Sequence, residues 1–228
     1  GTGSFANKTV GTGKAVTATG YGITGSDAGN YNLSAEPSGM TADITKASVS
    51  ITGVTASNKI YDGSTTATLS GGTLNGVIGS DDVTISAGTG AFIDEKLESG
   101  KTVIATGYGI TGTDAGNYTL TGQPSGMIAD ITGKPLTITG VTAANKVYDG
   151  TTDAILSGGT LNGVVGTDVV TFTSGTGSFA DKVVGSAKVV TAAGYSITGA
   201  DAANYTLVTQ PSGMTADITK ASVDITGV

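Results

Sequence analysis

Acidic and amide side chains are the main candidates for chemistry in this chain, because it contains no histidine and no cysteine. Asp114 and Asn117, with their copies Asp201 and Asn204, could supply oxygen ligands to a calcium ion. No dense calcium-binding loop surrounds these residues, so a turn that the Asp114 side chain caps is the alternative interpretation. We therefore expect no cofactor, with calcium as the one candidate ligand.

The composition provides few of the side chains that enzymes commonly use for catalysis. Without histidine or cysteine, the common nucleophile–base pairs lack their base and zinc lacks its usual ligands. Two carboxylates can act as acid and base, as in glycosidases. The recurring acids, however, fall in turns or at strand ends that explain them structurally; they include Asp43, Asp62 and Asp114. We predict that the protein is not an enzyme.

The segments that position these residues form a tandem repeat. Tyr61-Asp62-Gly63 returns as Tyr148-Asp149-Gly150, an offset of 87 residues (148 − 61). The offset predicts complete repeats at 47–133 and 134–220, the C-terminal part of a preceding repeat at 1–46, and the first strand of a following repeat at 221–228. Both ends resemble cuts through a longer array.

The composition predicts an all-β fold. Glycine, threonine and valine are frequent, good helix formers are few, and turn signals divide each repeat into seven or eight short strands. Asp114-Ala-Gly116-Asn-Tyr118-Thr-Leu120 resembles the tyrosine corner of immunoglobulin sandwiches, with a leucine in place of the core cysteine. The next repeat carries the same corner at Asp201, Tyr205 and Leu207. We expect Ig-like β-sandwiches.

The junctions between repeats predict an elongated rod. Met40–Lys46 runs into Ala47–Ile51 without a flexible linker, and Gly133 leads directly into Lys134-Pro135. A last strand that continues into the next first strand leaves little freedom at the junction. Neighbouring repeats are therefore the first partners that we expect.

Charge and hydropathy exclude two classes of partner. The net charge of −7 is spread along the chain, so there is no basic patch for nucleic acid. No segment is apolar enough for membrane insertion. The absence of cysteine fits a cytosolic protein and equally a large secreted one.

Asn58–Thr65 and Asn145–Thr152 resemble the signature of the YDG-type repeat, as do Ser70–Leu74, Gly107–Thr111 and the corner at Asp114–Tyr118. That family occurs as tandem copies in very large secreted bacterial proteins, many of them similar to filamentous haemagglutinin and exported by two-partner secretion. The resemblance implies an extracellular location at the bacterial cell surface and a role in adhesion.

We therefore predict a structural stalk or fibre segment of an extracellular adhesin or biofilm-matrix protein, acting as a semi-rigid spacer. One alternative is a repeated binding module that holds polysaccharide or a host or partner protein by avidity. Another is a subunit of an extracellular filament in which copies exchange strands.

The Tyr61-Asp62-Gly63 motif itself is predicted to be a turn over a packed tyrosine rather than a ligand site. Lys59, next to Asn58, could form an isopeptide cross-link, and a solvated lysine is the simpler interpretation.

Overall fold

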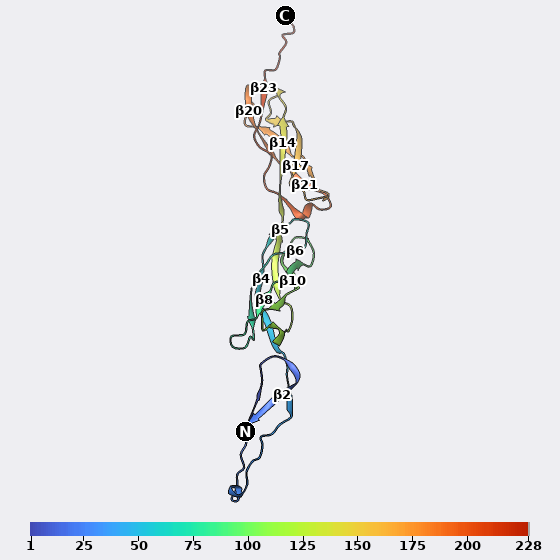
Figure 1. The fold of residues 1–228 in the computed structure, drawn as a ribbon. Coiled ribbons are helices and arrows are strands. Elements are labelled where there is room, and N and C mark those ends of the chain that lie inside the picture. The colour runs from blue at the N-terminus through green and yellow to red at the C-terminus, as the bar shows by residue number, and fades with distance from the viewer. Residues whose placement is uncertain (228) are drawn as a thin grey trace. The chain divides into compact units, whose positions relative to one another are not determined.

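The computed structural model describes residues 1–227, and Figure 1 labels strands from β2 to β23 within this part. Apart from three single-turn 3-10 helices, η1 to η3, the regular structure of the described residues is β, which confirms the predicted all-β class. None of the helices within residues 1–227 has the length or the apolar character needed to cross a membrane.

Contacts group the chain into two compact units, which are described separately. Unit 1 contains Gly1–Ala56, Ala67–Ala91 and Val103–Met127, and unit 2 contains Ser57–Thr66, Phe92–Thr102 and the chain from Ile128 onward.

The first segment contains β1 (Thr2–Phe5), β2 (Gly11–Thr19), η1 (Ala28–Asn30) and β3 (Met40–Ile44). The next repeat contains β4 (Ala47–Ala56), β5 (Lys59–Ile60), β6 (Thr66–Ala67), β7 (Leu69–Asn75), β8 (Thr84–Ser86), β9 (Thr89–Phe92), β10 (Glu98–Thr106), β11 (Gly109–Thr111), η2 (Ala115–Asn117), β12 (Tyr118–Leu120) and β13 (Met127–Thr132). The last repeat contains β14 (Lys134–Ala143), β15 (Lys146–Val147), β16 (Asp153–Ala154), β17 (Leu156–Asn162), β18 (Thr171–Thr173), β19 (Thr176–Phe179), β20 (Gly185–Ala193), β21 (Ser196–Thr198), η3 (Ala202–Asn204), β22 (Tyr205–Leu207) and β23 (Met214–Thr219).

Each complete repeat thus has ten strands rather than the expected seven or eight. The difference comes from pieces of two or three residues, such as β5 and β6, which are too short to show an alternating pattern in the sequence.

In unit 1, β4 lies between two strands of the same repeat. It pairs parallel with β12, where Val49 faces Leu120, and antiparallel with β7, where Ile51 faces Leu74. Val49, Val83 and the Tyr118 ring form the buried cluster beneath this sheet, and the half-buried Leu120 packs against it. In this repeat the corner tyrosine therefore belongs to the core, and the corner leucine lies at its edge.

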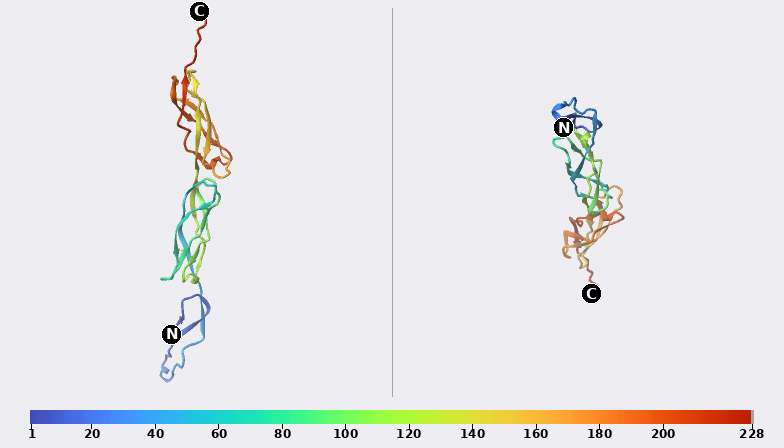
Figure 2. Two further views of the ribbon diagram at one scale, coloured as in Figure 1. Left: turned by 45° about the horizontal axis from the view of Figure 1, so that its top comes forward. Right: turned by 90° about the horizontal axis from the view of Figure 1, so that it is seen from below.

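In unit 2, the same arrangement surrounds β14, which pairs parallel with β22 and antiparallel with β17. A five-stranded sheet has the order β15-β23-β20-β19-β16. The corresponding order in the preceding repeat is β5-β13-β10-β9-β6. The yellow-to-red strands of the last repeat lie together in both views of Figure 2. Their core cluster contains Phe179, Val190, Met214, Ala216 and Ile218.

The junctions inside the units are short. In unit 1, only Thr45 and Lys46 separate β3 from β4, and in unit 2 Gly133 alone separates β13 from β14. The chain therefore passes from the last strand of one repeat into the first strand of the next almost without interruption.

Residues 221–227, expected to begin the first strand of a following repeat, pair with no other strand, and residue 228 lies outside the described residues. β4 and β14 are each held by two strands of their own repeat, and residues 221–227 have no such partners within the described part of the chain. Val223 and Ile225 are 90% and 88% exposed, although their counterparts in β4, Val49 and Ile51, are buried.

Candidate functional site

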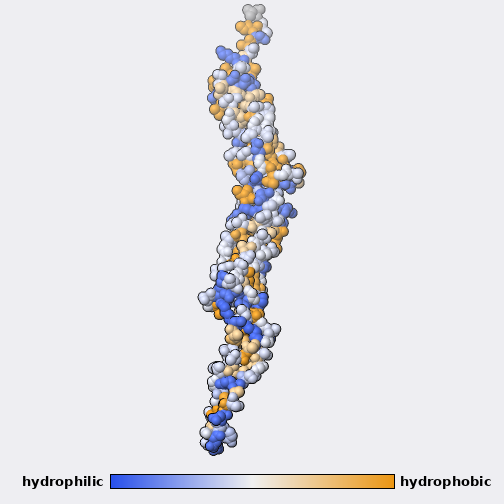
Figure 3. Space-filling model, viewed as in Figure 1, coloured by the Kyte–Doolittle hydropathy of each residue, from blue (hydrophilic) through white to orange (hydrophobic). Residues whose placement is uncertain are grey.

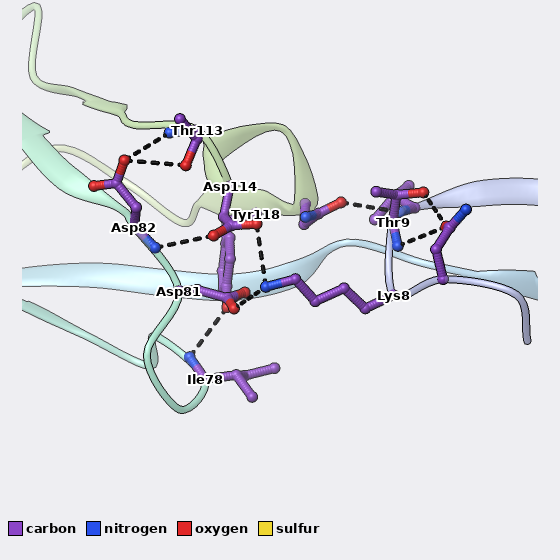
Figure 4. Close-up of polar contacts among 11 residues, drawn as sticks. Lys8, Thr9, Ile78, Asp81, Asp82, Thr113, Asp114 and Tyr118 are labelled. Carbon is purple, nitrogen blue, oxygen red and sulfur yellow. Dashed lines mark hydrogen bonds and ion pairs between the residues drawn. The ribbon is translucent and has the colours of Figure 1, made fainter.

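The tyrosine corner of unit 1 begins with a buried phenol at the start of β12. Tyr118 follows the 3-10 turn Ala115–Asn117 and is 3% exposed. Its hydroxyl accepts a hydrogen bond from the Ile78 amide at 3.1 Å and donates one to Asp81 Oδ2 at 2.7 Å (Figure 4). The backbone partner of the hydroxyl is thus Ile78, which lies 40 residues before the tyrosine, and not a group a few residues upstream as in the immunoglobulin corner.

Asp114 does not cap its own turn, contrary to the interpretation from the sequence. Its Oδ2 accepts a hydrogen bond from the Asp82 amide at 3.0 Å, while Asp82 Oδ2 accepts from the Thr113 amide and hydroxyl at 3.0 and 3.1 Å (Figure 4). The pairing of β8 with β11 brings the two loops together, so Asp114 satisfies an amide of the other loop. The bonds from Thr113 lower the pKa of Asp82.

Residues of the first segment contact this corner. The Lys8 ammonium bonds to Asp81 and lies 3.2 Å from Asp114 Oδ1 (Figure 4). The Val10 amide donates a hydrogen bond to Asn117 Oδ1 at 2.9 Å. The bond to Asp81 raises the pKa of Lys8, and the same bond lowers that of Asp81. Because the Lys8 side chain is 63% exposed, this ion pair orients the segment more than it stabilises it.

The four calcium candidates have their oxygens in different settings. Asp114 and Asn117 bind the amides and the ammonium just described, and Asp201 Oδ2 accepts from the Val169 amide at 2.8 Å. Asn204 ends η3. Within residues 1–227, no group of three or more acidic side chains is arranged to hold a metal ion.

In unit 2, the corner of the last repeat receives a tyrosine from the repeat before it. Tyr205 accepts a hydrogen bond from the Val165 amide at 2.9 Å and donates to Asp168 Oδ2 at 2.6 Å. Tyr61 donates to the same oxygen at 2.9 Å, and its ring meets that of Tyr205 edge-on with centroids 5.4 Å apart. Burial, followed by the bond to Asp168, raises the pKa of Tyr61 to about 12.

The rest of the Tyr-Asp-Gly turn presents this tyrosine. Asp62 Oδ1 accepts hydrogen bonds from the Ser64 amide and hydroxyl, both at 2.9 Å, and from Lys59 Nζ at 2.7 Å. Gly63 has φ +74°, and a Cβ there would lie 3.1 Å from a methyl group of Val165. Glycine therefore provides both the turn and the close approach to the next repeat.

Lys59 is not a solvated lysine, which corrects the simpler interpretation from the sequence. Its side chain is 16% exposed, and its ammonium binds the Ser64 and Thr66 carbonyls and lies 5.7 Å from the centre of the Phe92 ring. Asn58 exchanges hydrogen bonds with Asp130 instead. The Lys59 and Asn58 side chains thus bind different partners, which does not favour an isopeptide bond between them.

The last repeat has the same turn but a different environment around it. Lys146 binds Asp149 at 2.9 Å and lies 5.6 Å from the centre of the Phe179 ring. Lys59 contacts Asp62 and the Phe92 ring in the same way. Tyr148, however, is 40% exposed, whereas Tyr61 is 4% exposed. The contact with the corner of a following repeat accounts for the difference.

Replacing Lys146 with Met should raise the pKa of Asp149 from about 2 toward the ordinary value of 3.8, because the Lys146 bond is the largest cause of the lowering. A carboxylate with a lowered folded pKa adds stability that is present above about pH 4 and lost as the pH falls toward 2. The variant should lose this part of the acid dependence.

An NMR pH titration of the Asp149 side chain measures the change. Lys188→Met is the matched control, because the Lys188 ammonium binds Asp181 at 2.5 Å. It should leave Asp149 unaffected, and an unchanged Asp149 titration in Lys146→Met would contradict the assigned cause.

Sequence reasoning missed the partners of the Tyr-Asp-Gly turn. Asp81 and Asp168 are themselves 87 residues apart (168 − 81), so their recurrence was a usable signal. Nothing local links Tyr61 to Asp168, because 107 residues separate them.

These features define an all-β repeat protein in which the tyrosine corner of one repeat receives groups from the repeat before it. The family model of the YDG domain matches residues 1–39, 45–125 and 132–213, which is most of the chain. The chain therefore belongs to the YDG domain family, as the resemblance of its motifs predicted. No curated protein and no solved structure matches it.

Proposed function

We propose that this chain is a structural stalk or fibre segment, a semi-rigid spacer within an extracellular adhesin or biofilm-matrix protein at the bacterial cell surface. The observation that carries the proposal lies in unit 2. There, a single residue separates β13 from β14, and Tyr61 is buried against Asp168 and Tyr205 of the next repeat. Backbone continuity and a buried side-chain contact both resist bending at the same junction.

We also propose that each 87-residue repeat is an Ig-like sandwich. The first strand of each repeat pairs parallel with the strand that follows the corner, and the corner tyrosine of each repeat is buried. Strand bounds support the period, since β4 begins at Ala47 and β14 at Lys134, 87 residues later (134 − 47).

A passive role fits the polar groups described above. The recurring carboxylates bind amides, hydroxyls and ammonium groups of the protein itself, so they act in holding loops together. On the face that Figure 3 shows, hydrophilic and hydrophobic residues are interspersed rather than gathered into one apolar patch. We propose no enzymatic activity and no cofactor, with neighbouring repeats as the main partners.

The location rests on family resemblance. YDG repeats in proteins similar to filamentous haemagglutinin are secreted, and a chain without cysteine suits export in an unfolded form. The short junctions support the spacer role, and analogy with the family supports the extracellular location.

Small-angle X-ray scattering tests the spacer role. We expect the 228-residue chain to scatter as an elongated particle with restricted bending. A control variant with about ten Gly and Ser residues inserted after Gly133 should broaden the distribution of interatomic distances, since such linkers are flexible coils. A compact profile, or one that the insertion leaves unchanged, would contradict the proposal.

A further inference from the structure

We infer that the exposed Tyr148–Gly150 turn is a docking surface for a further YDG repeat, which it binds through an Asp–Tyr pair equivalent to Asp168 and Tyr205. The inference rests on the proposed spacer role, because it names the partner of a junction. The Tyr-Asp-Gly turn occurs twice, once with its tyrosine buried at Tyr61 and once with its tyrosine exposed at Tyr148.

The turn at Tyr61, which is covered by the next repeat, shows which groups such a surface binds. Around Tyr61, the partner supplies a carboxylate oxygen to the hydroxyl, an aromatic ring at 5.4 Å and an aliphatic side chain, Val165, against Gly63. These three groups come from one corner, since Tyr205 binds both the Val165 amide and Asp168. A repeat with this corner is therefore a complete partner.

The exposed copy lacks all three contacts. Tyr148 is 40% exposed, and a Cβ on Gly150 would meet no atom within 4 Å. A half-exposed aromatic ring beside an open glycine is therefore accessible to a partner.

The turn is already in the docking conformation without a partner. The Lys146–Asp149 distance is 2.9 Å where the covered turn has 2.7 Å, and the lysine-to-ring distances are 5.6 and 5.7 Å. The φ of Gly150 is +82° and that of Gly63 is +74°. A surface that needs no rearrangement binds its partner at a lower entropic cost.

The sequence after β23 identifies the partner as a repeat of the same kind. Ala221-Ser-Val223-Asp-Ile225 matches Ala47-Ser-Val49-Ser-Ile51, the start of the strand that holds the corner of its own repeat. Val223 and Ile225 are 90% and 88% exposed and have no sheet to join within the described chain. A repeat built on this strand would place its corner beside the Tyr148 turn, as β14 does for Tyr61.

Tyrosine nitration by tetranitromethane, read by peptide mass spectrometry, tests the inference. The 228-residue chain is compared with an extended chain in which a copy of residues 142–220 follows Val228, whose counterpart is Val141 (228 − 87). The copied segment carries Tyr148→Phe, so that its peptide is distinguishable. Tyr21 and Tyr31, 46% and 71% exposed, are the reactive references, and buried Tyr61 is the protected one.

We expect Tyr148 to react in the 228-residue chain and to become about as protected as Tyr61 in the extended chain, with Tyr21 and Tyr31 unchanged. Continued reaction of Tyr148 in the extended chain would overturn the docking surface. Asp168→Asn in the copied segment alone should restore part of the reactivity, and full protection there would overturn the role of the Asp–Tyr pair.

Tyr195 is a buried core residue whose peptide is common to the native and the copied repeat, so the absence of nitration in that peptide shows that the added repeat is folded. The scattering experiment on the 228-residue chain tests the spacer role separately. A rod-like chain with a reactive Tyr148 in its extended form would count against the docking surface alone.

Discussion

Tyr61→Ala is expected to lower the free energy of unfolding by about 3 kcal/mol, the range of large-to-small substitutions of buried aromatic side chains. The ring is 4% exposed and packs edge-on against Tyr205, and its hydroxyl binds Asp168. The substitution removes these contacts and leaves a cavity between two repeats. Chemical denaturation followed by circular dichroism measures the loss.

Tyr148→Ala is the matched control, because it changes the same motif position in a turn of the same geometry. With 40% of Tyr148 exposed, the cost should be no more than about 1 kcal/mol. Equal losses for the two variants would mean that the tyrosine stabilises its own repeat and not the junction. Tyr61→Phe should keep most of the stability, since the ring remains and only the bond to Asp168 is lost.

Much of the architecture follows from the sequence alone. The offset between Tyr61 and Tyr148 gives the repeat, the turn signals and β-favouring residues give the all-β class, and the motif gives the family. These features depend on local or periodic patterns, so they can be predicted from the sequence.

The contacts of the motif are not visible in this way. Tyr61 was predicted to pack beneath its own turn, and the structure buries it against Asp168 and Tyr205 of the following repeat. Asp114 was assigned to its own turn, yet β8 and β11 bring Asp82 to it. In both cases the partner is chosen by the packing of segments that are distant in the sequence.

The alternating pattern of β10 is enough to predict that Lys101 is buried. It shares strand parity with Val103 and Ala105, and all three are buried. Its ammonium lies 2.5 Å from Asp94 and 3.3 Å from Glu98, which satisfies the charge in place of water. Burial lowers the pKa of this lysine, but the bonds to the two carboxylates outweigh it and raise the pKa overall. Asp94 and Glu98 therefore act as counter-ions to a buried lysine.

Gly112→Ala is expected to lower the free energy of unfolding by about 3–5 kcal/mol, through two independent effects. Gly112 has φ +123°, a conformation that residues with a side chain rarely adopt, and a Cβ there would lie 2.2 Å from the Asp82 carbonyl oxygen. The backbone on one side of the corner would have to move. Thermal and chemical unfolding measure the loss.

Gly126→Ala separates the two effects, because Gly126 has φ +78° but open space where its Cβ would be. Its cost should be only about 1–2 kcal/mol, the price of a left-handed backbone for alanine. If Gly112→Ala costs no more than this control, the close approach to Asp82 is not a constraint. A larger loss should come with increased nitration of Tyr118, because Gly112 lets the Asp82 amide reach Asp114 and so keeps Asp81 beside the corner hydroxyl. The glycine would then be required for the surface that receives the preceding repeat, and not only for a turn.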